Sequence, residues 1–425
     1  MALGILGAVF GAAKVHALSH GYDITDSGRI GWTIAYAGVL GLAAYAVGLP
    51  ALSRTRTPLL VAAGGGALGA TIMSVVTLVA GGQLLPRFVI LGAAALVVPW
   101  YVLCARVAEG GRQRAEARDR VVVVGDNGEG ALLRTEVAGS PERPAVVVGT
   151  YDTESMTRDG LPLVRATEAA RASVVVLSRR ASELEHVVDQ AALLHRNGVR
   201  VRTLVGFYEE WLGKLPIAEL ERASMLFDIG EIHGRRYARL KRLTDVAVGA
   251  VGVVALALLV PAVAVGNVFG NRGAVFFRQD RIGQDGRPFR IWKFRTMRSA
   301  GEAEWTSADD ARVTTLGRVL RRTHLDEVPQ VINILRGDLS VVGPRPEQPQ
   351  YVAELSAKIP FYDLRHIVRP GLTGWAQVKF GYAGSEHDAL EKLQYDFFYL
   401  QRQTLGLDVR IVARTIRDVF GARGR

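Results

Sequence analysis

Long apolar segments dominate the pattern of hydrophobic and polar positions at the start of the chain. They cover residues 3–18, 30–50, 58–80 and 84–104. Three of them have about the 20 residues that a helix needs to cross the hydrocarbon core of a bilayer, whereas the first is shorter and contains Lys14 and His16. Their Gly and Ala residues favour close helix packing. The pattern predicts a transmembrane region of four helices over residues 1–105, with a buried bundle in a soluble protein as the alternative.

Basic residues beside these segments predict their orientation. Arg54 and Arg56 lie in the second loop and a cluster of Arg begins at Arg106, whereas the first and third loops contain only Arg29 and Arg87. Loops rich in Lys and Arg stay on the cytoplasmic side of a membrane. We therefore expect the second loop and everything after Arg106 to lie in the cytoplasm.

Residues 120–228 show short β-branched runs that alternate with helical stretches. The runs cover residues 121–124, 145–148, 173–177 and 199–204, and one helical stretch covers 181–197. This alternation is typical of a parallel sheet. The turn after the first run has glycines spaced G-x-x-G-x-G, which differs from the dinucleotide-binding pattern. We predict a Rossmann-like domain whose turn binds no nucleotide and whose role is regulatory or dimer-forming; phosphate binding at the turn is the alternative.

A fifth apolar segment, residues 246–265, has basic residues on both sides and contains Pro261. Its length suits a membrane span. Both basic flanks, however, favour the cytoplasmic side, and a proline bends a helix because it lacks a backbone donor. We predict a re-entrant membrane helix over residues 243–267 that kinks at Pro261, with a fifth span as the alternative.

The segment 316–346 has the densest mixture of cations and carboxylates in the chain. It contains Arg321, the adjacent Asp326 and Glu327, Asp338, and Arg345 between Pro344 and Pro346. Such a mixture suits an anionic, metal-bound substrate, typically a phosphate ester. The surrounding pattern predicts an α+β catalytic domain over residues 235–425.

Further candidate substrate-binding residues lie on either side of this segment. A hairpin with strands 276–279 and 289–294 is predicted. Lys293 lies near the end of its second strand and Arg295 directly follows it, and a solvated basic strand edge is the alternative to phosphate binding by these two residues. Arg369, Trp375 and Gln377 lie among tight turns and could hold a nucleotide base, although Trp375 also suits a core. Helices are expected at 350–359 and, as one amphipathic basic helix, at 389–420.

Two interpretations apply to Asp326 and Glu327. Pro329 is tolerated only in the first turn of a helix, so Asp326 would cap that helix and Glu327 would lie in its first turn. Alternatively, one carboxylate attacks phosphorus, and a divalent metal and Arg supply the positive charge that this step needs. Oxygen ligands without a His/Cys cluster favour Mg²⁺ over zinc.

Composition narrows the classes of partner. The net charge is +11 and 49% of the residues are hydrophobic, and the Lys and Arg lie beside apolar segments. This distribution favours anionic membrane lipid over nucleic acid. The single cysteine, Cys104, excludes an internal disulfide and a cysteine metal site.

Five ordered motifs resemble the bacterial sugar transferase family. They are KRLTD (241–245), KFRTM (293–297), LDEVPQ (325–330), RGDLSVVGPRPE (336–347) and RPGLTGWAQV (369–378). The N-terminal arrangement is similar to that of the large polyprenyl glycosylphosphotransferases, which initiate exopolysaccharide, capsule or O-antigen synthesis at the inner membrane of bacteria. The resemblance implies transfer of sugar-1-phosphate from a UDP-sugar to polyprenyl phosphate, with release of UMP.

The resemblance also implies roles for individual residues. Asp326 would form a phosphosugar-aspartyl intermediate, and Glu327 would hold Mg²⁺ or activate the acceptor. Arg321, Lys293 and Arg345 would neutralise phosphates, and Asp338 would order its loop. Val260 and His324 stand where the family often has other residues, so the kink at Pro261 and the role of His324 stay open. Direct transfer with Glu327 as base and a catalytically silent scaffold are the alternative functions, and a homodimer is an open prediction.

Overall fold

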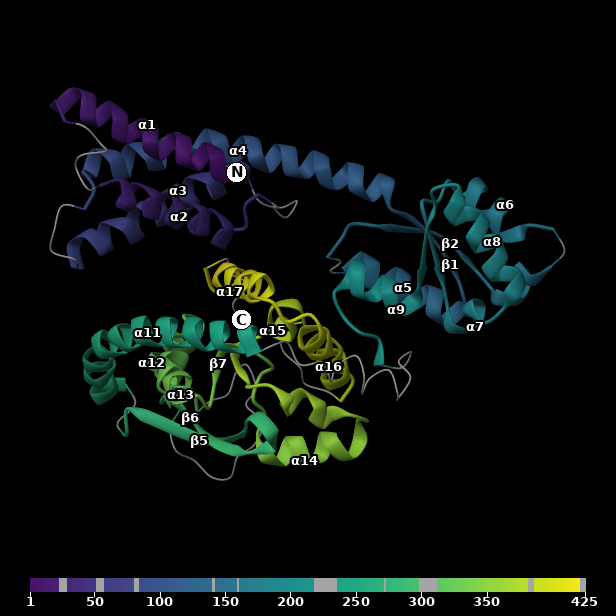
Figure 1. Ribbon diagram of the computed structural model, residues 1–425. Coiled ribbons are helices and arrows are strands. Elements are labelled where there is room, and N and C mark those ends of the chain that lie inside the picture. Colours follow the sequence, from purple (N-terminus) through teal and green to yellow (C-terminus); the bar gives the residue numbers. More distant parts are fainter. Residues whose placement is uncertain are drawn as a thin grey trace. The chain divides into compact units, whose positions relative to one another are not determined.

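The computed structural model of the chain is shown in Figure 1 and describes residues 1–22, 29–50, 57–79, 84–139, 142–158, 160–217, 235–270, 273–297, 312–380 and 386–420. It divides into two compact units, Met1–Gln113 with Val412–Arg425, and Arg114–Ile411. Arg54 and Arg56, the segment 298–311 and the end of the predicted Rossmann-like domain lie outside the described residues.

Four helices form the N-terminal part of the first unit, as predicted. They are α1 (Ala2–His20), α2 (Ile30–Ala46), α3 (Pro58–Val79) and α4 (Arg87–Arg118). Three of them, α1, α3 and α4, are long and apolar enough to cross a membrane, and α11 (Arg235–Gly270) is the fourth such helix among the described residues. The sequence pattern marked the first segment as the short one, but α2, with 17 residues, is the shorter helix. These helices indicate a membrane protein.

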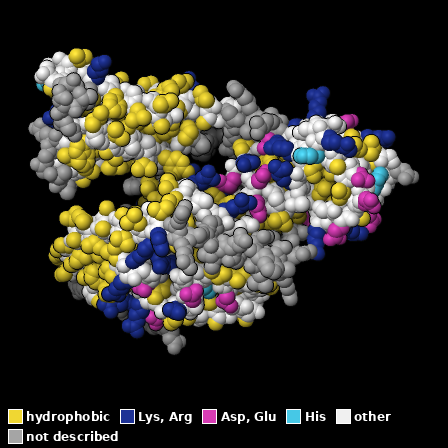
Figure 2. Space-filling view, viewed as in Figure 1, with side chains coloured by type: hydrophobic (Ala, Val, Ile, Leu, Met, Phe, Trp, Pro, Cys, Tyr) yellow, Lys and Arg dark blue, Asp and Glu magenta, His cyan; other side chains and the backbone are white. Residues whose placement is uncertain are grey.

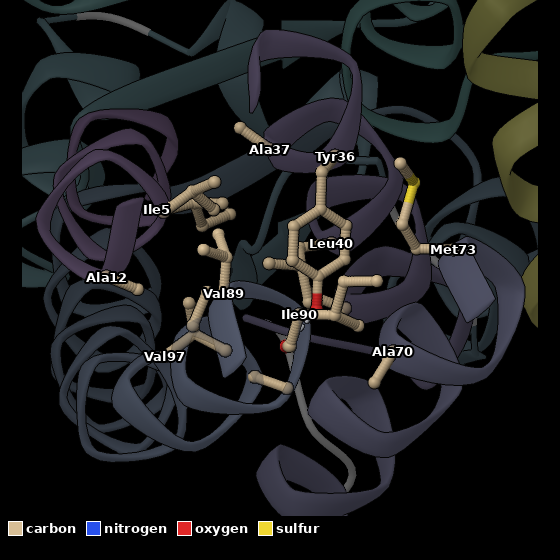
Figure 3. Close-up of a cluster of buried hydrophobic side chains, with 14 of the residues drawn as sticks. Ile5, Ala12, Tyr36, Ala37, Leu40, Ala70, Met73, Val89, Ile90 and Val97 are labelled. Atoms are coloured by element: carbon tan, nitrogen blue, oxygen red, sulfur yellow. Dashed lines mark hydrogen bonds between the residues drawn. The ribbon is translucent and has the colours of Figure 1, made fainter. Parts of the chain in front are cut away.

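Small residues and two tyrosines hold these four helices together, and Figure 3 shows one of the tyrosines, Tyr36, among the buried side chains. The hydroxyl of Tyr36 donates to the carbonyl of Ile90 at 2.6 Å, and the hydroxyl of Tyr101 donates to the carbonyl of Leu40 at 2.8 Å. A Cβ at Gly66 would lie only 2.7 Å from the carbonyl oxygen of Ala94. The close packing expected from the Gly and Ala content is therefore present.

The second unit begins with an α/β domain. Its parallel sheet has the order β2-β1-β3-β4, formed by β1 (Arg120–Val124), β2 (Val146–Tyr151), β3 (Val174–Leu177) and β4 (Arg200–Thr203). Its helical elements are η1 (Thr153–Thr157), α5 (Asn127–Gly139), α6 (Pro162–Ala169), α7 (Arg179–Ser182), α8 (Glu185–Arg196), α9 (Leu204–Phe207) and η2 (Tyr208–Leu212). Alternate residues of β1 enter separate cores on the two faces of the sheet. All four predicted strands are confirmed, whereas the helix predicted at 181–197 is divided into α7 and α8.

The glycine-rich turn after β1 is closed by its own glutamate. The Oε2 of Glu129 accepts a hydrogen bond from the backbone N–H of Asp126 at 2.9 Å, and a Cβ at Gly125 would collide with this carboxylate. The carboxylate thus takes the place at the start of α5 where a phosphate would bind. This contact favours the interpretation that the turn binds no nucleotide.

The long helix α11 follows the α/β domain and contains Pro261. At about 1.5 Å per residue it is roughly 54 Å long, which exceeds the hydrocarbon core of a bilayer. In Figure 1 its ribbon changes direction toward the Gly270 end. Figure 2 shows hydrophobic side chains over α11, and its exposed residues include Leu243, Val251, Leu258 and Phe269.

The remaining elements surround the predicted site. They are β5 (Phe276–Ile282), η4 (Gln284–Gly286), β6 (Pro288–Phe294), α12 (Thr315–Arg322), η5 (Leu325–Gln330), α13 (Val331–Arg336), β7 (Ser340–Val342), α14 (Pro349–Lys358), η6 (Tyr362–Ile367), β8 (Gly371–Thr373), α15 (Trp375–Phe380), α16 (Glu386–Gln401) and α17 (Leu405–Phe420). The hairpin and the helix at 350–359 are confirmed. The prediction of a single helix at 389–420 is wrong, because α16 ends at Gln401 and a new helix, α17, begins at Leu405. The hydroxyl of Thr404 caps the start of α17 by accepting a hydrogen bond from the N–H of Leu407.

Buried charges join the α/β domain to α15 and α16. The Nζ of Lys214, which is 2% exposed, lies 3.0 Å from Glu136 of α5 and 2.5 Å from Glu391 of α16. The indole N–H of Trp375 donates to the carbonyl of Gly213 at 2.7 Å. Trp375 is therefore a buried contact of this interface, as one of its two predicted interpretations suggested.

Candidate active site

The carboxylate pair lies in the 3-10 turn η5, which precedes α13. His324 begins the turn in the left-handed conformation, with φ 54°, and makes no side-chain cap. Asp326 is therefore not the N-cap of an α-helix, and that interpretation is wrong. Pro329 stays outside the α-helix that begins at Val331, which agrees with its missing backbone donor. In a 3-10 turn neighbouring side chains point about 120° apart, so Asp326 and Glu327 face different surroundings.

Asp326 is buried among cations. The residue is only 9% exposed. Burial and the neighbouring charge of Glu327 raise the pKa of Asp326, although Lys293, Arg321 and His324 act in the opposite direction. Arg321 is fixed by a 3.0 Å hydrogen bond from its Nε to the hydroxyl of Thr296. Asp326 is thus a carboxylate in a poorly hydrated position that is bordered by positive charge.

Glu327 is held by two cations. The Nζ of Lys293 lies 2.8 Å from its Oε1, and the Nη2 of Arg345 lies 3.7 Å from the same oxygen. Burial alone would raise the pKa of Glu327, but Lys293 and Arg345 outweigh it and lower the pKa to about 2. Glu327 is therefore ionised at neutral pH, and the two neighbouring carboxylates have pKa values shifted in opposite directions.

A pocket opens beside Glu327. It is lined by Arg281, Ile291, Lys293, Glu327, Gln330, Arg345, Pro346, Gly371 and Leu372. In the antiparallel pairing of β5 with β6, the side chains of Arg281, Ile291 and Lys293 lie on the same side of the hairpin. The predicted residues Lys293, Glu327, Arg345 and Pro346 therefore meet in one pocket.

Backbone contacts fix the loop that carries Arg345. The carbonyl of Pro344 accepts from the N–H of Gly371 at 2.8 Å, and the carbonyl of Arg345 accepts from Arg365 at 3.1 Å. Arg365 is itself buried and ion-paired with Asp396 at 2.7 Å. A Cβ at Gly371 would collide with the backbone of Gly343, so this approach of β8 to the loop requires glycine.

Other predicted residues lie outside the pocket lining. The side-chain amide of Gln377 donates a long hydrogen bond of 3.5 Å to the carbonyl of Leu372. Arg295 and Arg369 are half-buried and do not line the pocket. Asp338 accepts a hydrogen bond from Asn333 at 3.2 Å, which agrees with its predicted role in ordering the loop.

The KRLTD motif anchors α11 to this part of the chain. Arg242 donates to the carbonyls of Ile334 and Leu335 at 2.6 and 2.7 Å. Asp245 accepts from the hydroxyl of Ser340 and from the N–H of Val341, both at 2.9 Å. The motif therefore connects the apolar helix to α13 and β7.

Sequence reasoning missed five lining residues, which are Arg281, Ile291, Gln330, Gly371 and Leu372. The strand alternation that places Lys293 toward the pocket also places Arg281 there, but the pairing register was needed to see it. Gln330 and Leu372 belong to recognised motifs without any charge that would have marked them.

Comparisons with known proteins agree with the motifs. A family model described as bacterial sugar transferase matches residues 236–422. Over 193 residues the chain is 44% identical to the UDP-N-acetylgalactosamine-undecaprenyl-phosphate N-acetylgalactosaminephosphotransferase of Aeromonas hydrophila, a match that covers 44% of this chain and 46% of the relative.

Two further relatives are named as UDP-glucose:undecaprenyl-phosphate glucose-1-phosphate transferases. The protein from Xanthomonas campestris is 31% identical over 331 residues, which cover 72% of this chain and 67% of the relative. The protein from Caulobacter vibrioides is 41% identical over 185 residues, which cover 42% of this chain and 69% of the relative. The Xanthomonas match therefore extends beyond the region that the family model covers.

Proposed function

Because this chain belongs to the bacterial sugar transferase family, we propose that it transfers sugar-1-phosphate from a UDP-sugar to polyprenyl phosphate and releases UMP. The observation that carries the proposal is the buried carboxylate Asp326 beside Lys293 and Arg321, next to a pocket that contains further cations. A carboxylate that could act as the nucleophile, close to cations that could bind a diphosphate, supports this reaction.

The proposed first step forms a bond between a carboxylate oxygen of Asp326 and the β-phosphorus of the UDP-sugar. The bond between that phosphorus and the bridging oxygen breaks, and UMP leaves with the bridging oxygen and its electron pair. The burial of Asp326 favours this role, because a poorly hydrated carboxylate has less water to lose before it attacks. Lys293 and Arg321 offset the repulsion between the carboxylate and the diphosphate.

In the second step, a phosphate oxygen of polyprenyl phosphate attacks the same phosphorus. The bond to Asp326 breaks, which regenerates the carboxylate and gives the polyprenyl diphosphate-sugar. Glu327, ionised and held by Lys293 and Arg345, orients these two cations along the phosphates. Direct attack of the acceptor on the UDP-sugar is the competing route, and the order of product release separates the two.

Mg²⁺ belongs to this proposal as a cofactor. The described residues contain no group of three or more His, Cys, Asp or Glu that could hold a metal ion. Although their side chains point in different directions, Asp326 and Glu327 are close enough for each charge to affect the other, and they would hold a Mg²⁺ ion that completes its shell with substrate phosphates and water. When bound, the ion would offset the negative charge of the diphosphate.

The contacts of α11 support a re-entrant membrane helix. Gly249 and Gly252 face Leu335 and Val331 of α13, whereas Gly266 and Gly270 face Leu316 of α12. Both halves of α11 thus pack on the same domain, which a helix that leaves the membrane on the far side could not do. We infer that the catalytic domain lies on the cytoplasmic face of the inner membrane, and that the α/β domain has a regulatory or dimer-forming role.

The test is an assay of UMP release by the purified protein with Mg²⁺, undecaprenyl phosphate, and a panel that includes UDP-glucose and UDP-N-acetylgalactosamine. We expect one donor to be used, and Asp326→Asn to abolish release. UMP released before the acceptor is added would favour the covalent route. Activity of Asp326→Asn near the wild-type level would exclude that route, and a folded protein that is silent with every donor would favour a scaffold function. Asp280→Asn, at an exposed carboxylate on β5, is the matched control.

A further inference from the structure

Arg281 is a buried cation that lines the pocket at the end of β5. Its side chain is 13% exposed, and it lies on the side of the hairpin that also carries Lys293. Charged residues are rarely buried unless they are paired or bind a ligand. The hydrogen bonds and charges around Arg281 therefore show what it is placed to bind.

The guanidinium of Arg281 keeps one buried donor without an acceptor. Its Nη1 donates to the carbonyl of Pro346 at 3.2 Å, and its Nη2 donates to the side-chain oxygen of Gln279 at 2.9 Å. Its Nε is buried and has no hydrogen-bond partner in the part of the chain that the structure describes. A buried donor without a partner costs free energy, which a bound acceptor recovers.

Repulsion between two guanidinium groups adds to this need for an anion. Burial and then the charge of Arg345 lower the pKa of Arg281, although Glu347 and Glu327 act in the opposite direction. The nearest carboxylate, that of Glu347, is 3.7 Å away, which is too long for a hydrogen bond. An anion between Arg281 and Arg345 would relieve the repulsion of the two cations.

Arg281 lines one pocket with Lys293, Glu327 and Arg345, whereas Asp326 and Arg321 are not among the residues that line it. Of the cations in the pocket lining, Lys293 also acts on Asp326. In phosphoryl transfer the nucleophile and the leaving group lie on opposite sides of phosphorus, roughly in line. Cations that hold the leaving phosphate are therefore expected among those that do not act on the nucleophile.

We propose that Arg281, together with Arg345, binds the nucleotide-side phosphate of the donor, which leaves as the phosphate of UMP. This subsite rests on the proposed function. Its chemistry is that of a phosphate monoester or diester oxygen, which both the nucleotide and the polyprenyl acceptor carry. The experiment must therefore distinguish these two sources.

The test compares the binding of UMP and uridine by the full-length protein, measured as the ligand-induced rise in Tm, for the wild type and three variants. We expect Arg281→Gln to weaken UMP about tenfold and to leave uridine unchanged, because a charge-assisted hydrogen bond to the phosphate is lost. Arg281→Lys keeps the charge without the planar fork, so an intermediate loss of about threefold is expected. Arg290→Gln is the matched control, since Arg290 lies on the same hairpin and is 71% exposed.

A kinetic measurement then identifies the source of the phosphate. Arg281→Gln should raise the KM for the UDP-sugar and the inhibition constant of UMP, and should leave the KM for undecaprenyl phosphate unchanged. A rise in the KM for undecaprenyl phosphate alone would assign Arg281 to the acceptor and overturn the proposal. Unchanged UMP affinity in folded Arg281→Gln, or in Arg281→Lys if the first variant does not fold, would also overturn it.

The two proposals fail in different ways. If the wild type releases UMP but the Arg281 variants bind UMP normally, only the subsite is wrong. If no UDP-sugar yields UMP, the proposed function fails, and the comparison of UMP with uridine still decides whether Arg281 binds a nucleotide phosphate.

Discussion

The ammonium group of Lys293 lies 2.8 Å from the carboxylate of Glu327 and joins strand β6 to the turn that carries Asp326. The positive charge of the same lysine also acts to lower the pKa of Asp326. One cation therefore serves two neighbouring carboxylates whose pKa values move in opposite directions. The folded protein therefore disfavours the ionised form of Asp326 and stabilises the ionised form of Glu327.

We expect Asp326→Asn to raise the Tm of the protein at neutral pH while it abolishes UMP release. The folded-state pKa of Asp326 is raised, so ionised Asp326 opposes folding at every pH above its unfolded pKa. An amide of the same shape removes this cost. The Tm in detergent should rise by a few degrees, and Asp280→Asn should leave it unchanged; a lower Tm for Asp326→Asn would contradict the prediction.

We expect Glu327→Gln to lower stability by up to roughly 3 kcal/mol at neutral pH, since one pKa unit corresponds to about 1.4 kcal/mol. The folded pKa of Glu327 is lowered to about 2 from 4.5, so its contribution is present above pH 4.5 and disappears as the pH falls toward 2. The measurement is the Tm difference between variant and wild type across this range. A difference that does not shrink with acidification would rule out the electrostatic origin.

We expect both ends of α11 to be accessible from the cytoplasmic side. Cysteines introduced at Leu240 and Phe269, which are exposed near the two ends, would be labelled in a Cys104→Ser background with a reagent that does not cross membranes. Both should react in inside-out vesicles and neither in spheroplasts. Arg29→Cys, in a loop predicted to be periplasmic, is the control with the opposite pattern. Labelling of Phe269→Cys in spheroplasts would instead indicate a spanning helix.

We expect Lys214→Met to lower the Tm of the protein clearly. The substitution leaves Glu136 and Glu391 buried without their shared cation, and breaking a buried ion pair typically costs about 3–5 kcal/mol. Adding Glu136→Gln and Glu391→Gln should recover much of the loss. Lys358→Met, at an exposed pair with Glu354, should have little effect. Equal effects of the two lysine substitutions would mean that the buried contact contributes no stability.

Local patterns predicted those parts of the fold that depend on neighbours in the sequence. The β-branched runs gave the parallel strands, and the Gly283–Gly286 region gave the β5–β6 hairpin. The turn at Asp326 was assigned incorrectly because a left-handed His324 leaves no mark in the residue pattern. The break between α16 and α17 depends on the cap at Thr404, which apolar periodicity does not show.

Long-range contacts account for most of what the sequence did not reveal. Lys214 has acidic partners 78 positions before it and 177 positions after it, so its burial could not be expected from its surroundings in the chain. Arg281 became a candidate only once the hairpin register and the Arg345 loop were known. The motifs indicated Lys293, Glu327 and Arg345 as residues of one site, and the structure brings the three together, but the ion pairs between them were not predicted.

The two hydrogen bonds from Arg242 to the last carbonyls of α13 couple the apolar helix rigidly to the helix that follows the carboxylate pair. A re-entrant helix stays in one leaflet, and the basic residues on both of its flanks hold it at the level of the anionic head groups. The height of the pocket above the head groups is then set by that attachment. The content of anionic lipid should therefore tune the turnover of this protein, even with donor, acceptor and every side chain unchanged.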